Sequence, residues 1–206
     1  MNYLSRNNIV TLTQEGFIRK QFADKKECQK ERKLYAQLIM LDFFPKVMAK
    51  GDYYIDLEYL GENTLQKILS EREKDGDKQC FLEYMRKLAE VFRRLHAYRN
   101  YEFVYRDVNF RNFIEKNGKL YCIDLADLGT GELCQPLGET IAFLLTYDEA
   151  FTPYKFDCAG ELLDYYVKNF GYEKWQYVDY AKRMLAKLAA NREKYWNIES
   201  IIACII

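Results

Sequence analysis

Three polar residues in the middle of the chain have the types and spacing that phosphoryl transfer needs. Asp107 is followed five residues later by Asn112, and Asp124 comes twelve residues after that. Transfer of a phosphoryl group to a hydroxyl needs one carboxylate to receive the hydroxyl proton, and it needs oxygen ligands that hold Mg²⁺ on the nucleotide phosphates. Residues of these types at this spacing could serve such a reaction, with Asp107 as the proton acceptor and Asn112 and Asp124 as the metal ligands.

The segment between the last two of these residues predicts how they meet. Phe113–Glu115 and Leu120–Ile123 have the composition of two short strands, and Asn117-Gly118 between them is a strong signal for a two-residue hairpin. We expect the hairpin to bring Asp124 back beside Asn112. Both oxygen ligands can then reach one hard cation.

The wider pattern predicts strands in the first part of the chain and helices in the rest. The expected strands are 8–12, 17–22, a region beginning at Pro45, 53–60 and 103–105, and a helix is expected at 25–41. The helices expected after residue 60 are 64–73, 78–96, a weaker one near 139–145, 158–169 and 172–195. We therefore expect an α+β fold.

Composition excludes several classes of function. The 206 residues carry 31 basic and 31 acidic side chains, so the chain has no general charge bias toward nucleic acid or a membrane surface. Its six cysteines form no C-x-x-C pair and it has one histidine, so the sequence favours neither a zinc site nor a disulfide framework. We find neither a segment of transmembrane length nor a signal peptide, and we expect a cytoplasmic protein.

The segment from Tyr105 to Asn112, with the downstream Asp124, resembles the catalytic loop H-R-D-x-x-x-x-N of protein kinases and their metal-binding Asp. This resemblance implies a minimal bilobal fold, with a mainly-β N-lobe at 1–60 and a reduced helical C-lobe at 61–206. It also implies a kinase that uses ATP and Mg²⁺ to phosphorylate a hydroxyl acceptor. Arg111 matches an arginine of tyrosine kinases and is expected to neutralise the transferred phosphate.

Phe17-Ile18-Arg19-Lys20 resembles the V-A-I-K strand of kinases. Strand alternation places Ile18 and Lys20 on one face, where Ile18 could cover the adenine and Lys20 could reach the phosphates. Glu31 lies inside the apolar stripe of the helix expected at 25–41, and an inward carboxylate is costly unless it is paired. We therefore predict a Lys20–Glu31 ion pair, with Glu27 as the alternative partner.

A second stretch resembles the kinase hinge, the strand that leaves the small lobe. In Leu57-Glu58-Tyr59-Leu60-Gly61, extended backbone would offer the Glu58 carbonyl and the Leu60 amide to an adenine edge. An ordinary edge strand would have the same composition, so this assignment depends on the resemblance.

The chain also departs from the kinase pattern. The glycine-rich phosphate loop is missing, because the candidate turn has only Gly16, and Asp124-Leu125-Ala126 stands where D-F-G would. Asp127-Leu128-Gly129 imitates that motif three residues later and is the alternative metal site. These departures favour a pseudokinase, which binds nucleotide without turnover, as the alternative function.

Only 82 residues follow Asp124, and A-P-E is absent, so a platform for peptide substrates is missing. The chain therefore resembles the small atypical kinases. They include the RIO type, the kinase of the KEOPS complex, the lipopolysaccharide-core sugar kinases and, more distantly, the aminoglycoside and choline phosphotransferases. This resemblance slightly favours a small molecule or sugar over a protein as the acceptor.

Overall fold

The structure is a computed structural model, and it describes residues 2–3, 8–100, 102–147 and 149–206. The chain divides into two compact units. The first unit contains residues 1–63 and 113–126, and the second contains residues 64–112 and 127–206. The predicted hairpin therefore belongs to the first unit, although it follows the catalytic loop in the sequence.

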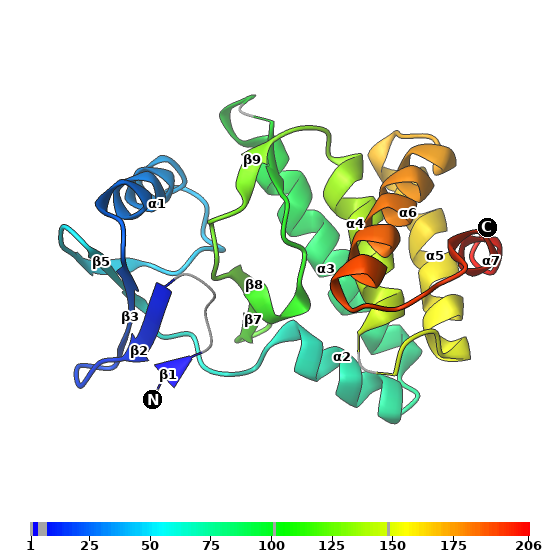
Figure 1. The fold of residues 1–206 in the computed structure, drawn as a ribbon, viewed down its shortest axis with the longest axis horizontal. Helices are drawn as coiled ribbons and strands as arrows, with labels where there is room; N and C mark the ends of the chain where they lie inside the picture. Colours follow the sequence, from blue (N-terminus) through cyan, green and yellow to red (C-terminus); the bar gives the residue numbers. More distant parts are fainter. Residues whose placement is uncertain (1, 4–7, 101, 148) are drawn as a thin grey trace. The chain divides into compact units, whose positions relative to one another are not determined.

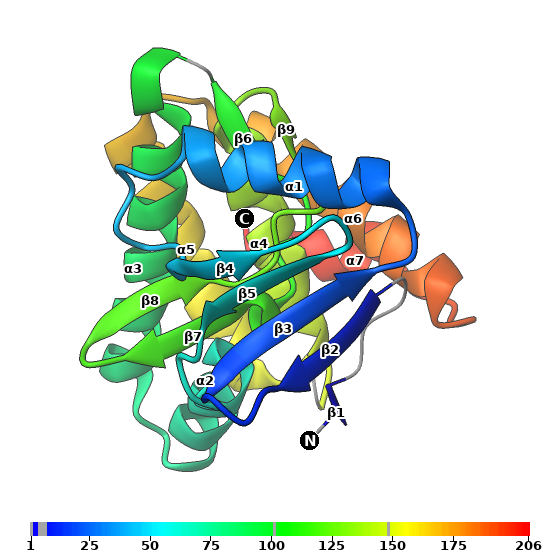
Figure 2. The same cartoon turned by 90° about the vertical axis from the view of Figure 1, so that its left-hand side faces the viewer.

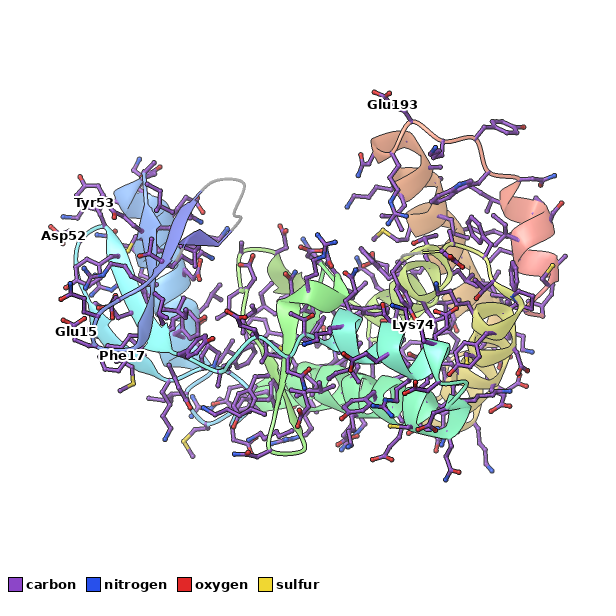
Figure 3. All side chains as sticks on the ribbon, turned by 90° about the horizontal axis from the view of Figure 1, so that it is seen from below. Glu15, Phe17, Asp52, Tyr53, Lys74 and Glu193 are labelled. Atoms are coloured by element: carbon purple, nitrogen blue, oxygen red, sulfur yellow. The ribbon has the colours of Figure 1, made fainter. Side chains whose placement is uncertain are left out.

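The first unit is built on an antiparallel sheet of five strands, in the order β1-β2-β3-β5-β4 (Figure 1). The strands are β1 (Asn2–Tyr3), β2 (Asn8–Leu12), β3 (Phe17–Phe22), β4 (Val47–Lys50) and β5 (Tyr54–Glu58). The turn between β2 and β3 needs the positive φ of Gly16, a backbone conformation that glycine adopts without strain, and Glu15 and Phe17 flank it (Figure 3).

Helix α1 (Lys25–Gln37) packs against β3 and β5 of this sheet (Figure 2). Asp24 caps its first turn by accepting a hydrogen bond from the Lys26 amide. The helix was expected to reach Leu41, but it ends at Gln37. Leu38 and Leu41 remain buried in the turn that follows, so the apolar spacing continues beyond the last helical residue.

The hairpin predicted from Asn117-Gly118 is present. Strands β7 (Phe113–Lys116) and β8 (Lys119–Cys122) pair in antiparallel register, with Phe113 opposite Cys122. Both turn residues have positive φ, which is the geometry of a type I′ turn. The Cys122 amide donates to the Phe43 carbonyl, and this bond ties the hairpin to the first unit.

The second unit is mainly helical. Its helices are α2 (Leu65–Lys74), α3 (Lys78–His96), α4 (Cys134–Thr146), α5 (Pro153–Phe170), α6 (Lys174–Asn191) and α7 (Ile198–Ala203). A two-stranded sheet joins β6 (Phe103–Tyr105) to β9 (Leu128–Thr130), and short 3₁₀ turns lie at η1 (Tyr98–Asn100) and η2 (Phe110–Asn112). None of the helices in the described part of the chain has the length and apolarity needed to cross a bilayer.

Helix α4 is the centre of this helical unit and packs against α3, α5 and α6. Eleven of its thirteen residues are buried. A helix buried on all sides has no clear polar face, so its periodicity is weak, and the sequence predicted only 139–145. Buried Lys155 supports the C-terminal end of α4, because its ammonium donates to the carbonyls of Tyr147 and Glu149, both at 2.7 Å.

Candidate active site

Lys20 lies on β3 with its side chain turned into the first unit. Its ammonium is 3.0 and 2.8 Å from the two carboxylate oxygens of Glu31 and 3.1 Å from Oδ1 of Asp124. The neighbouring Arg19 points to the opposite face and binds Asp56 through two hydrogen bonds of 2.7 Å. Strand alternation thus separates the two cations, and Ile18 shares the face of Lys20, as predicted.

The inward glutamate on α1 is Glu31. It is 4 % exposed, whereas Glu27 is exposed and forms no ion pair among the described residues. Burial raises the pKa of Glu31, and the nearby ammonium of Lys20 opposes that rise. Burial would lower the pKa of Lys20, but the charges of Glu31 and Asp124 outweigh it and leave that pKa raised. The predicted Lys20–Glu31 pair is therefore present.

Asp124 follows the β7–β8 hairpin and completes this cluster. Its Oδ1 accepts from the Lys20 ammonium and from the Ala126 amide, both at 3.1 Å. The side chain is 42 % exposed, so it can reach a ligand in solvent while it stays oriented by two donors. Asp127 belongs to the second unit, where its carbonyl accepts from the Arg106 amide.

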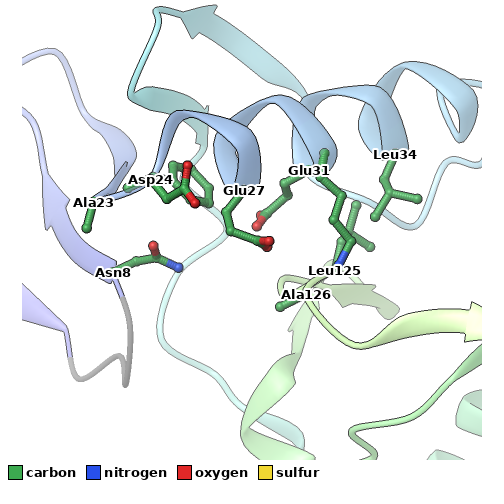
Figure 4. Close-up of a pocket in the computed structure, with 10 residues that line it drawn as sticks. Asn8, Ala23, Asp24, Glu27, Glu31, Leu34, Leu125 and Ala126 are labelled. Carbon is green, nitrogen blue, oxygen red and sulfur yellow. The ribbon is translucent and has the colours of Figure 1, made fainter.

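A cavity of about 320 Å³ lies beside this cluster within the first unit (Figure 4). Its lining residues are Asn8, Phe22, Ala23, Asp24, Glu27, Lys30, Glu31, Leu34, Leu125 and Ala126. Glu27 and Glu31 reach it from the same helix, one turn apart (Figure 4). The cavity adjoins the residues predicted to bind phosphate, so we treat it as part of the same candidate site.

The hinge-like segment is held by a residue that the sequence reasoning missed. Lys116 of β7 donates to the carboxylate of Glu58 at 3.0 Å and to the carbonyl of Tyr59 at 3.3 Å. Glu58 is the last residue of β5, and Leu60 is buried two residues later. Lys116 reaches this segment only because the hairpin lies beside it in the fold. No local sequence motif predicts the contact.

The catalytic loop lies in the second unit and is organised by the side chain of Asn112. The side-chain Nδ2 of Asn112 donates to Oδ2 of Asp107 at 2.9 Å, and the backbone amide of Asn109 donates to Oδ1 of Asp107 at 3.4 Å. Asp107 has no ion-pair partner among the described residues. Its carboxylate is therefore oriented by neutral donors, which leaves its charge uncompensated by a cation within the loop.

Aromatic side chains fix this loop to the helices of the second unit. Phe110 is 1 % exposed, and its ring lies 6.2 Å from that of Phe143 on α4 and 5.8 Å from that of Tyr147, the residue that follows α4. Tyr105, which replaces the usual histidine, is buried and stacks on Phe92 at 6.2 Å. These contacts hold the loop from both sides of Asp107, so the position of Asp107 follows from core packing.

The two arginines of the loop have different surroundings. Arg106 donates to the carbonyl of Thr130 at 2.8 Å, which joins the loop to β9. Arg111 is exposed, and its guanidinium donates to the Gln66 side chain at 2.9 Å. The sequence predicted a phosphate-binding role for Arg111 and did not identify Gln66, because that contact joins residues 45 positions apart.

Glu139 on α4 is a titratable residue that the sequence reasoning did not single out as functional. Burial raises its pKa to about 7; Gln135 and Lys187 oppose this rise, Asp107 adds to it and Arg106 also opposes it. The signal that could have identified it is a glutamate inside the apolar run Pro136–Leu145.

The predicted metal ligands have suitable chemistry for Mg²⁺. Asn112 uses its amide nitrogen to hold Asp107, which leaves the amide oxygen as the atom that can face a cation. Asp124 supplies a partly exposed carboxylate. An amide oxygen and a carboxylate are the kinds of donor that a hard cation prefers, so the residues present fit the ion.

We compared the chain with known proteins. No protein-family model matches it, and no curated protein matches it in sequence. Solved structures of aminoglycoside phosphotransferases share its fold. APH(2'')-Ib with ADP bound has a TM-score of 0.52 and 15 % identity, over 98 % of this chain and 84 % of that one.

Two structures of APH(2'')-IIa are similar in the same way. The ternary complex with streptomycin and ATP has a TM-score of 0.54 and 16 % identity, and covers 98 % of this chain and 87 % of that one. The gentamicin complex has a TM-score of 0.52 and 14 % identity, and the match covers 98 % of this chain and 88 % of that one.

The chain has a kinase-like fold. Its small β-sheet unit and its helical unit match those of phosphotransferases that belong to the protein-kinase-like superfamily, which confirms the predicted fold class. At 14–16 % identity the likeness establishes the fold alone. The finer resemblance to the RIO and KEOPS kinases stays a prediction.

Proposed function

We propose that this protein is an ATP- and Mg²⁺-dependent phosphotransferase that moves the γ-phosphate of ATP to a hydroxyl group of a small molecule. The observation that carries the proposal is the Lys20 ammonium shared between Glu31 and Asp124, which come from a helix and a loop 93 residues apart in sequence. A buried cation held by two carboxylates is costly to assemble, and its orientation suits it to phosphate binding.

The residues of the first unit bind and orient the nucleotide in this proposal. Lys20 contacts phosphate oxygens, and Glu31 keeps its ammonium from swinging away. Ile18 covers the adenine, while the Glu58 carbonyl and the Leu60 amide contact the adenine edge. Asn112 and Asp124 would hold Mg²⁺, which would supply positive charge to neutralise the phosphate oxygens.

The residues of the catalytic loop act on the acceptor. Asp107 accepts a hydrogen bond from the acceptor hydroxyl and receives its proton as the oxygen attacks the γ-phosphorus. The bond from that phosphorus to the β,γ-bridging oxygen breaks, and ADP leaves with that oxygen. The donors Asn112 and Asn109 fix the direction of the Asp107 carboxylate, so the base is positioned before the acceptor arrives. Arg111 lies on the same loop and neutralises charge on the transferred phosphate.

Two observations favour a small molecule as the acceptor. The described chain has no A-P-E motif after Asp124 on which a peptide could dock. The similar structures were solved with streptomycin and ATP or with gentamicin, which are small molecules with many hydroxyl groups. A small molecule with several hydroxyl groups is the first class of acceptor to test.

The test is transfer of labelled γ-phosphate from ATP, with Mg²⁺, to a panel of aminoglycosides, sugars, lipids and generic proteins. We expect Mg²⁺-dependent labelling of at least one small hydroxyl compound, and labelling at least about a hundredfold slower with Asp107→Asn. The alternative is a pseudokinase, which the missing glycine-rich loop favours. Wild-type protein that binds ATP but transfers and hydrolyses nothing would establish that alternative.

A further inference from the structure

Glu139 lies on the face of α4 that carries the catalytic loop. Glu139 and Phe143 are four residues apart, so their side chains follow one another along one side of the helix, and Tyr147 is the residue that caps its C-terminal end. Phe143 and Tyr147 hold the ring of Phe110 in the loop. The helix thus offers the loop an aromatic contact and, one turn earlier, a carboxyl group.

The carboxyl of Glu139 is only half satisfied. Its Oε1 accepts from the Gln135 side chain at 3.1 Å, while Oε2 is buried and has no hydrogen-bond partner among the described residues. The residue is 8 % exposed, so water does not solvate the second oxygen freely. An ionised carboxylate in such a place is costly, and a proton on it removes the cost.

The charges that act on Glu139 most strongly come from the loop and from α6. Burial raises its pKa to about 7, Lys187 of α6 lowers it, Asp107 raises it and Arg106 lowers it. No charge from α3, α5 or β6, which also pack against α4, acts on it as strongly. The proton on Glu139 is therefore linked to the two charged residues at the start of the catalytic loop.

We propose that Glu139 is a positioning residue for the catalytic loop and that it works in its protonated form. With the proton in place, Asp107 keeps its hydrogen bonds from the loop, and Arg106 keeps its bond to the Thr130 carbonyl. When the proton leaves, the new negative charge repels Asp107 and attracts Arg106 away from Thr130. The loop then loses the arrangement that orients Asp107.

The link between Glu139 and the loop can be measured without any turnover. Carboxyl-labelled glutamate in the full chain allows the titration of Glu139 to be followed by NMR, with Glu139→Gln used to assign its signal. We expect a midpoint near neutral pH that falls in Asp107→Asn, because a like charge has been removed. A midpoint in the ordinary range of glutamate, or one that Asp107→Asn does not move, overturns the proposal.

The effect on the reaction depends on the proposed function and needs a second measurement. Turnover of ATP with gentamicin as the acceptor should fall above neutral pH by up to about tenfold per pH unit, because the protonated fraction of Glu139 decreases at that rate. Glu139→Gln mimics the protonated acid and should keep the low-pH rate without the fall. The same fall in Glu139→Gln as in wild type overturns the proposal.

Two control variants separate positioning from general damage. Phe143→Leu loosens the aromatic contact on the same face and should lower kcat while the fall with pH stays. Glu139→Asp keeps a titrating group and should keep the fall, which matters if Glu139→Gln is poorly folded. The two proposals can fail separately. If the Glu139 midpoint shifts in Asp107→Asn but the wild-type protein shows no turnover, the link between Glu139 and the loop is supported and the proposed phosphotransferase function is contradicted.

Discussion

The two units bury their acidic groups in different ways. In the first unit Glu31 and Asp124 share the ammonium of Lys20, so the buried carboxyl group of Glu31 has a cation 2.8 Å away. In the second unit Asp107 is held by neutral donors, and Glu139 has only a neutral donor on one of its two oxygens. The buried acid of the first unit therefore has a cation partner, whereas Glu139 of the second unit has none among the described residues.

The difference has a functional counterpart in the proposed reaction. A group that binds phosphate must hold a constant charge, and a mutual ion pair achieves this over a wide pH range. A group that accepts a proton works best without a tight cation partner, because such a partner would weaken its attraction for the proton. The surroundings of Lys20 and Asp107 suit these two tasks.

The largest expected effect is on phosphoryl transfer, and it separates the role of Asp107 in the second unit from nucleotide binding by the first unit. Asp107→Asn keeps the size of the side chain and removes the proton acceptor, so transfer should fall by about a hundred- to ten-thousand-fold. Binding of ATP, measured by calorimetry, should persist because the first unit is unchanged. Asp127→Asn is the matched control and should transfer normally. Equal rates in wild type and Asp107→Asn would contradict the role of Asp107.

The next effect tests the buried ion pair. Removal of one partner leaves a charge in the interior, so Lys20→Met and Glu31→Leu should each lower the free energy of unfolding by about 3–5 kcal/mol. The double variant should lose less free energy of unfolding than the two single variants together. Both charges of the pair are then removed, so neither is left in the interior without its partner. Urea unfolding of the four proteins gives the coupling.

Exposed charges provide the controls for this cycle. The Lys25–Asp52 pair lies at the surface, and the same cycle on it should give negligible coupling. Glu27→Leu should leave the coupling of Lys20 unchanged, because Glu27 forms no ion pair among the described residues. If the losses in free energy of unfolding for Lys20→Met and Glu31→Leu simply add, the two side chains have no coupling energy, and the proposed role of the pair is contradicted.

A smaller effect tests the unpaired acid of the second unit through stability. The pKa of Glu139 rises from 4.5 to about 7 on folding, so the folded protein binds a proton that the unfolded chain has lost. Stability should therefore fall as pH rises through this window, by about 3 kcal/mol at most, and stay low above it. Glu139→Gln should lack this slope, which unfolding at a series of pH values would detect.

The smallest effect concerns the metal ligand. ATP with Mg²⁺ should raise the thermal midpoint, because a ligand that binds only the folded state stabilises it by about 2.7 kcal/mol at a hundred times its Kd. Asp124→Asn should remove most of the Mg²⁺-dependent part, and Asp127→Asn should not. If the variants behave in the opposite way, the metal role belongs to Asp127.

Local patterns in the sequence were enough to predict most of the elements. Strands β2, β3 and β6 and helix α3 have the predicted bounds, because their alternation or helical spacing is set by neighbours within a few residues. The hairpin followed from Asn117-Gly118, whose turn chemistry is local. Glu31 was predicted to pair with Lys20 because helical spacing alone shows which side chains face inward.

The tertiary structure decided what depends on distant parts of the chain. The full extent of α4, the strand β9 and the contacts of Lys116 and Gln66 have no local signal, since packing or pairing with remote segments creates them. Glu139 is the clearest case. The sequence shows Glu139 only as a glutamate in an apolar run. Its pKa of about 7 comes from burial in the helical core beside a loop that other residues fix.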